Sequence, residues 1–141
     1  MSRSIEIVFG FDFGLKRIGV AVGQTLTKTA NPLTTLQAKQ GVPDWPALDK
    51  LMVTWRPQAF VVGRPVRMDG SEQPITQASD IFASTLTERY HLPLFRIDET
   101  LTSHAAKDFL IERMQTTKRI KPQLDPISAK ILLEMWLKEV K

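Results

Sequence analysis

Residues 8–22 read VFGFDFGLKRIGVAV, and this stretch decides the fold as two short strands joined by a tight turn. Apolar side chains alternate along both halves, at positions 9, 11 and 13 and then at 18, 20 and 22. Because successive side chains of a strand point to opposite faces, this period of two indicates β-structure. The other face of the first strand carries Gly10, Asp12 and Gly14. A glycine weakens a strand and often marks a place where something approaches the backbone closely.

Asp12 is the candidate functional residue of this stretch. A carboxylate between two phenylalanines is poorly solvated unless it faces a cleft or a cation, so the pattern indicates a metal or phosphate site. The structural alternative is an aspartate that hydrogen-bonds the turn at Leu15 and Lys16. Intrinsic strand propensity disfavours both aspartate and glycine here, which favours the functional interpretation.

The composition is that of one globular domain, which we expect to span residues 1–141. Hydrophobic residues make up 43% of the chain and charged residues 24%, as in ordinary globular proteins. The lack of cysteine excludes a disulfide framework, a thiolate zinc site and a cysteine nucleophile. With neither a membrane-spanning apolar run nor a secretory leader pattern, we expect a cytoplasmic protein with no membrane partner. The net charge of +4 permits a polyanionic partner.

Beyond residue 22, strand and helix patterns alternate. Strands are predicted at 33–37 (an edge strand), 59–63 and 94–98. Helices are predicted after the N-cap Asp44, from Pro74, from 102 or 103, and from Pro126 with Asp125 as its N-cap. Residues 116–124 lack periodicity and are interpreted as a mobile basic loop. A strand–helix–strand unit implies parallel pairing. The chain is therefore predicted to be an α/β domain with a mixed five-stranded sheet, antiparallel on the hairpin side and parallel on the other, and helices on its faces.

Carboxylates are predicted to gather at one end of this sheet. Asp12 lies on the first strand, Asp98 and Glu99 end the last strand, and Asp125 caps the last helix. Sites in open α/β sheets form outside the carboxyl ends of strands, and we expect the first and last strands to run parallel and to end beside the final helix. Clustered carboxylates bind hard cations such as Mg²⁺ or Mn²⁺, which can activate water for phosphodiester hydrolysis. Taken alone, Asp125 is more often a simple N-cap than a functional acid. Glu99 taken alone is as often a solvated loop acid as a functional one.

Basic residues near these acids are candidates for binding a nucleic-acid backbone. They are Lys16, Arg17, Arg64, Lys118, Arg119 and Lys121. Each one alone is more typical of a solvated surface charge. His104 follows the second acidic pair and could aid proton transfer, although a plain surface histidine is the commoner case.

The motifs at 9–22, 61–65 with 68–71, 98–103 and 125–129 closely resemble those of the YqgF/RuvX family, in the same order and over nearly the whole chain. Members of this family are described as pre-16S rRNA nucleases and as Holliday junction resolvases. The resemblance implies an RNase H-like fold and a metal-dependent nuclease that processes the 5′ end of pre-16S rRNA. It also implies that Asp12, Glu99 and Asp125 are catalytic and metal-binding, with Asp98 adjacent.

The chain departs from the family pattern at three places. Gly23 and Gln24 stand where the family usually has Ser-Asp, Arg64 stands in place of a leucine, and Thr100 in place of an arginine. The missing arginine removes one expected contact to phosphate or carboxylate. The three acids are retained.

Three other functions are open at this point. Junction-resolving DNA cleavage needs two symmetric cuts and predicts a stable dimer, so the sequence allows a monomer or a homodimer. Sugar kinase, actin and Hsp70-like ATPases also have an Asp-x-Gly hairpin, but they need two such domains. The last alternative is a non-catalytic RNA-binding module that retains the acids.

Overall fold

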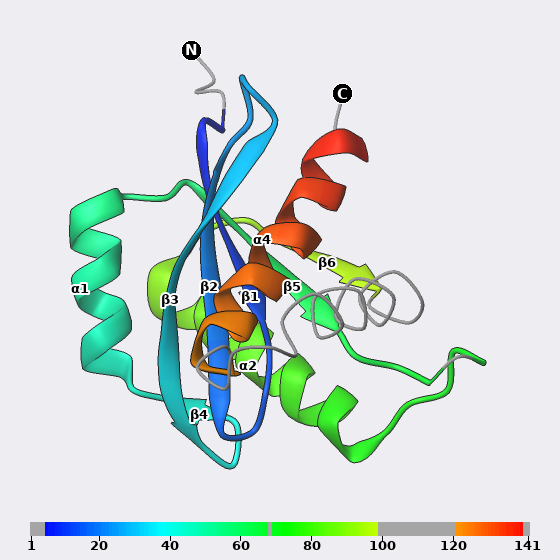
Figure 1. Cartoon of the computed structure of the whole chain (residues 1–141). Coiled ribbons are helices and arrows are strands. Elements are labelled where there is room, and N and C mark those ends of the chain that lie inside the picture. Colours follow the sequence, from blue (N-terminus) through cyan, green and yellow to red (C-terminus); the bar gives the residue numbers. More distant parts are fainter. Residues whose placement is uncertain (1–4, 68, 99–120, 140–141) are drawn as a thin grey trace.

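A computed structural model describes residues 5–67, 69–98 and 121–139 of the chain (Figure 1). Its sheet has six strands in the order β4-β3-β2-β1-β5-β6. The strands are β1 (Ile7–Asp12), β2 (Arg17–Gln24), β3 (Thr29–Lys39), β4 (Val42–Pro43), β5 (Ala59–Arg64) and β6 (Leu94–Asp98). The helices in the described ranges are α1 (Trp45–Trp55), α2 (Pro74–Tyr90) and α4 (Lys121–Glu139).

The strand β1 lies in the interior of the sheet, between β2 and β5. It pairs antiparallel with β2 and parallel with β5. The strands from β2 to β4 continue antiparallel, whereas β6 runs parallel to β5. The mixed sheet and the shared direction of the first and last strands are therefore confirmed.

The predicted count of five strands is wrong, because β4 adds a sixth. This strand has only two residues, which pair with Ala38 and Lys39. Two residues are too few to produce a visible alternation, so no sequence pattern indicates them. The third strand is also longer than predicted, because Pro32 and an irregularity in its pairing with β2 obscure its period.

The first two helices begin where the sequence predicts. The Asp44 side chain accepts a hydrogen bond from the Ala47 N–H at 3.3 Å, which satisfies one donor of the first turn of α1. This helix ends at Arg56, which has a left-handed backbone conformation just before Pro57. Pro74 is the first residue of α2, where its missing N–H is not needed.

The predicted start of the last helix is wrong. The helix begins at Lys121, so Asp125 lies within it rather than at its N-cap, and Pro126 is an interior residue. The first turn contains another proline, Pro122, which suits the opening of a helix as well as Pro126 does. Residues 121–124 are therefore helical instead of belonging to a loop. Residues 116–120 and the helix predicted from 102 or 103 lie outside the described residues.

Two hydrophobic layers hold the sheet between helices (Figure 1). Phe9, Phe11 and Phe60 pack with α1 and α2 on one face. On the other face, α4 packs against the sheet through an apolar side. The buried residues on that side are Ala129, Leu132, Leu133 and Leu137. Because β1 is covered on both faces, its backbone is held by packing from two directions.

Candidate functional site

Asp12 is the last residue of β1 and is only 4% exposed. It pairs with Gly19 of β2. On the other side, Phe11 pairs with Val62 of β5, so Gly63 is the next residue beside Asp12. Alternation along β1 puts Asp12 on the face of Val8, which is the face that α4 covers. Asp12 therefore has a glycine beside it on each neighbouring strand.

Gly19 and Gly63 are the neighbours that sequence reasoning missed. Each interrupts an apolar strand pattern, and such an interruption is a signal of close approach. The signal can be interpreted only once the strand order is known, because Gly63 is distant from Asp12 in sequence. The structure brings both glycines to the level of the carboxylate.

Gly10 and Gly14 have structural explanations of their own. A Cβ atom on Gly10 would lie 2.8 Å from the Cβ of Leu133, so the close approach predicted at this strand is made by α4. A Cβ atom on Gly14 would collide with the carbonyl oxygen of Arg17 across the β1–β2 turn. The two glycines therefore support the site by admitting α4 and the turn.

The direction in which α4 runs shows which end of the helix lies nearer to Asp12. Leu133 lies against Gly10 and Gly23, whereas Leu137 reaches only Gly23, which pairs with Val8 near the start of β1. Moving backward along α4 therefore leads toward the end of β1. Positions 125, 129, 133 and 137 recur every four residues and share one side of the helix. The backbone position of Asp125 is thus on the stripe that faces the sheet, about two turns or 12 Å before Leu133.

Ser128 belongs to the same part of α4. It is 4% exposed, and its hydroxyl oxygen has no hydrogen-bond partner within the described ranges. A buried hydroxyl without a partner is uncommon, since it forfeits its bonds to water. The sequence gives no warning of it, because serine is equally common on exposed helix surfaces.

Asp98 does not lie beside Asp12. The neighbour of β1 in the parallel half is β5, and β6 is one strand further out. Asp98 pairs with Arg64, and alternation puts both on the face of Arg96, which α2 covers. The last strand therefore runs parallel to the first without adjoining it, because the β5–α2–β6 crossover adds β6 at the outer side. Glu99 and His104 lie outside the described residues.

Arg64 is predicted to contact nucleic acid, but its guanidinium is already engaged. It donates to both carboxylate oxygens of Asp80, at 3.1 and 3.2 Å, and lies 3.4 Å from a carboxylate oxygen of Glu72. Arg96 donates to the same Asp80 at 2.8 Å. The bond from Arg64, followed by that from Arg96, holds the pKa of Asp80 below its ordinary value.

The same network fixes the end of β5 beside Asp12. Arg96 donates to the carbonyl oxygens of Val62 at 3.2 Å and Gly63 at 3.3 Å. Ser79 of α2 donates to the Gly63 carbonyl at 3.1 Å and accepts from Arg96 at 2.7 Å. These bonds satisfy carbonyl groups at the strand end and hold the end of β5 to α2 and β6.

The predicted basic residues are only partly described. Lys16 and Arg17 are exposed at the β1–β2 turn, at the same end of the sheet as Asp12. The backbone of Lys121 begins α4. Lys118 and Arg119 lie outside the described residues.

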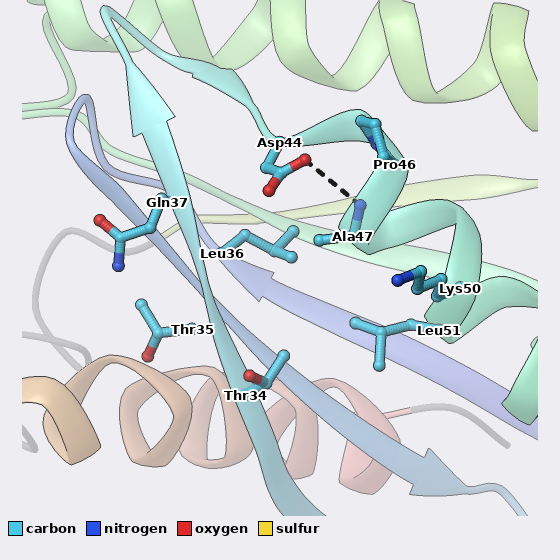
Figure 2. Close-up of a pocket in the computed structure, with 9 residues that line it drawn as sticks. All are labelled: Thr34, Thr35, Leu36, Gln37, Asp44, Pro46, Ala47, Lys50 and Leu51. Carbon is cyan, nitrogen blue, oxygen red and sulfur yellow. Dashed lines mark hydrogen bonds between the residues drawn. The ribbon is translucent and has the colours of Figure 1, made fainter.

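A groove between β3 and α1 lies apart from the acidic residue (Figure 2). Leu36 points toward Ala47 of α1, whereas Thr35 and Gln37 lie on the other side of β3. The polar residues that line the groove include the N-cap Asp44 and the exposed Lys50. Since Thr35 pairs with Gly19, the Asp12 side of the sheet is the side away from this groove. The groove therefore does not include Asp12.

The described residues fit a hard cation only in part. They contain no group of three or more His, Cys, Asp or Glu side chains placed to hold a metal ion. Asp12 itself offers the right chemistry, since Mg²⁺ and Mn²⁺ prefer carboxylate oxygens. The carboxylates predicted to complete the set, Glu99 and Asp125, have side chains outside what the structure describes. Within the described ranges, every helix is also too short or too polar to cross a membrane.

The architecture is that of an RNase H-like α/β protein with a carboxylate at the end of its central strand. A solved structure described as "T. thermophilus RuvC in complex with Holliday junction substrate" matches with a TM-score of 0.54 and 15% identity, covering 94% of this chain and 93% of that one. A fowlpox virus resolvase solved with its substrate Holliday junction DNA matches with a TM-score of 0.57 and 11% identity, covering 94% and 97%. These likenesses confirm the fold that the sequence motifs imply.

The family model described as "RuvX: Holliday junction resolvase" matches residues 6–139. The chain belongs to this family, as its motifs predict. A relative from Coxiella burnetii (strain Dugway 5J108-111) is 51% identical over 96% of this chain and 94% of its own length. Another from Legionella pneumophila (strain Paris) is 44% identical over 94% and 96%. Both relatives are named "Putative pre-16S rRNA nuclease".

Proposed function

We propose that this protein is a metal-dependent nuclease that hydrolyses phosphodiester bonds, with the 5′ end of pre-16S rRNA as its substrate. The observation that carries the proposal is the placement of Asp12. Its carboxylate is buried at the carboxyl end of the central strand, between two strand glycines, where a polyanion can approach the backbone closely. The names of the two bacterial relatives support the choice of substrate.

Asp12, Glu99 and Asp125 are the proposed catalytic and metal-binding acids. Position 125 lies on the sheet-facing stripe of α4, toward the Asp12 end. Glu99 directly follows Asp98 in the sequence, and Asp98 ends the last strand of the parallel half of the sheet. A divalent ion, Mg²⁺ or Mn²⁺, would neutralise phosphate charge and activate the attacking water. The role of Asp12 is to fix the position of that charge, because packing on both faces of β1 prevents it from moving.

Nucleic acid is proposed to bind over the basic residues at this end. Lys16 and Arg17 are on the turn that follows Asp12, and Lys118, Arg119 and Lys121 precede Asp125 in sequence. Such contacts supply affinity without reading a base sequence. Arg64 acts indirectly, since its bonds to Asp80 hold α2 against the sheet.

A Holliday junction is the alternative substrate, because both fold neighbours were solved with junction DNA or are named for it. That activity would require a homodimer, whereas rRNA processing is compatible with a monomer. We propose a single domain acting in the cytoplasm in either case.

The test compares the wild type with Asp12→Asn on three substrates: a pre-16S rRNA fragment, a four-way DNA junction and a plain duplex. Asp12→Asn keeps the shape of the side chain and removes its charge, so cleavage should be lost while folding and nucleic-acid binding persist. The matched control is Asp44→Asn, since asparagine caps a helix as well as aspartate does. This control should cleave at the wild-type rate.

Metal binding has a readout that does not depend on cleavage. Millimolar Mg²⁺ should raise the melting temperature of the wild type and of Asp44→Asn, but not that of Asp12→Asn, because a ligand that binds only the folded state stabilises it. Cleavage by Asp12→Asn at the wild-type rate would refute the acidic mechanism. The non-catalytic RNA-binding module would then be the better interpretation.

A further inference from the structure

Two turns are joined at the end of the sheet where β1 finishes. The Ala38 N–H donates to the carbonyl oxygen of Lys16 and the Gly41 N–H to that of Leu15, both at 2.9 Å. Gly41 has a φ of +85°, and a Cβ atom there would lie 2.9 Å from Cζ of Phe13. A glycine is needed at this position to let the turns come together. The β1–β2 turn and the β3–β4 turn thus form one fixed surface.

This surface, which we name the basic tip, comprises Leu15, Lys16, Arg17, Lys39 and Val42. All five residues are exposed, Leu15 by 43% and Val42 by 58%. Neither Lys16 nor Lys39 forms an ion pair within the described part of the chain. Their ammonium groups are therefore able to take an external anion, beside two apolar side chains that are in contact with water.

Two cations of the basic tip, Arg17 and Lys39, follow a line from Asp12 along the strands. Asp12 pairs with Gly19, and Arg17, two residues back along β2, pairs with Gln37. Lys39 is two residues further along β3. Period-two alternation puts Arg17 and Lys39 on the face of Asp12. At about 3.4 Å per residue, they lie about 7 and 14 Å beyond the carboxylate along the strands.

We propose that the basic tip binds a single-stranded segment of nucleic acid as it leaves the Asp12 end of the sheet. Lys16 and Lys39 take phosphates, and Leu15 and Val42 contact unpaired bases. Phosphate binding alone would explain the cations but not the apolar pair. In a duplex the faces of the bases are stacked on one another and a protein cannot reach them. Apolar side chains therefore gain contact area only against unstacked bases. The inference rests on the proposed function for the class of ligand, and it adds Leu15, Lys39 and Val42 to the binding surface.

The test measures binding without divalent ions, so that no cleavage is needed. Its probes are a labelled oligoribonucleotide and the same strand annealed to its complement. Lys39→Gln should reduce the slope of log K against log salt by about 0.7 on the single strand, and Lys39→Arg should restore it. Val42→Ser should weaken single-strand binding by about threefold to tenfold and leave duplex binding unchanged.

The opposite end of the sheet provides matched controls (Figure 1). The β2–β3 turn also carries an exposed leucine and an exposed lysine, Leu26 and Lys28. Leu26→Ser and Lys28→Gln should bind like the wild type, and thermal melts verify that each variant is folded.

Wild-type affinity in both Lys39→Gln and Val42→Ser would overturn the inference, as would equal losses in the control variants. Equal weakening of single strand and duplex by Val42→Ser would overturn the preference for unpaired bases. A wild-type protein that binds in this way but cleaves none of the three substrates would refute the proposed nuclease function and leave the inference intact.

Discussion

Replacing Gly10 by alanine should damage both stability and catalysis, because α4 packs directly on this residue. The new Cβ atom would lie 2.8 Å from Cβ of Leu133, with Cδ2 and Cγ of the same leucine at 3.2 and 3.3 Å. A Cβ atom is fixed to its backbone, so it cannot move aside by rotating a side chain. The contact can be relieved only if α4 moves away from the sheet.

The expected magnitude follows from two opposing effects. Overpacking a core costs about 1–3 kcal/mol, whereas replacing a glycine inside a strand by alanine returns about 0.5–1 kcal/mol. Gly10→Ala should therefore lower the free energy of unfolding by about 1–2 kcal/mol. Because α4 also carries Asp125, and a misplacement of about 1 Å can reduce a rate about 100-fold, cleavage should fall at least about tenfold.

Gly23→Ala is the matched control on the neighbouring strand. Its nearest contacts would be Cδ2 of Leu133 at 2.9 Å and Cδ1 of Leu137 at 3.1 Å, which are ends of flexible side chains. Rotation of these ends relieves the contact, so the net change in stability should stay within about 1 kcal/mol. Urea denaturation with a common m-value would measure both variants. If Gly10→Ala proved as stable and as active as Gly23→Ala, the close packing of α4 would not control the site.

Two further predictions concern the other face of the sheet. The folded-state pKa of Asp80 is lowered, mainly by its hydrogen bond from Arg64. The charged form of Asp80 therefore stabilises the fold above the unfolded pKa of about 3.9. That stabilisation is lost as the pH falls through the folded-state pKa. The stability difference between wild type and Asp80→Asn should therefore be largest near neutral pH and shrink below about pH 4 in urea titrations; a difference constant with pH would contradict the ion pairing. Tyr90 is the single tyrosine of the chain, and burial, followed by its 2.6 Å hydrogen bond to Asp49, raises its pKa to about 12. Spectroscopic titration of the phenol in the folded protein should show this midpoint and a lower one in Asp49→Asn; an unchanged midpoint would exclude the bond as a cause.

Local patterns predicted local structure well in this chain. The alternation around Asp12 indicated β1 and β2, because burial of one face imposes a period of two. Asp44 located the start of α1 and Pro74 that of α2, because a cap and a proline act through the backbone of the first turn alone. Each of these signals depends on residues within a few positions of one another.

The errors arose where the decisive contact is distant in sequence. Nothing local indicates that Gly63 lies beside Asp12, since this depends on the insertion of β5 between β1 and β6. The start of α4 was predicted wrongly for a local reason, because Pro122 suits a first helical turn as well as Pro126 does. The ion pair between Arg64 and Asp80 was likewise not foreseen, because Asp80 lies on the following helix. The three acids were proposed together, but the structure describes only the side chain of Asp12.

The two faces of the sheet divide stability and function between them. On the side of α1 and α2, the aromatic rings of Phe11, Phe60 and Phe82 pack with centroids 5.5–5.6 Å apart, a spacing typical of favourable aromatic contacts. On the α4 side, the residues that meet the helix are small, such as Gly10 and Ala21, so the helix backbone approaches the strands closely. A large side chain on the α4 side would move the helix away from the carboxylate. The aromatic face therefore contributes apolar burial, which offsets the cost of placing the charged Asp12 in an interior strand. The small residues on the other face let α4 approach β1 closely.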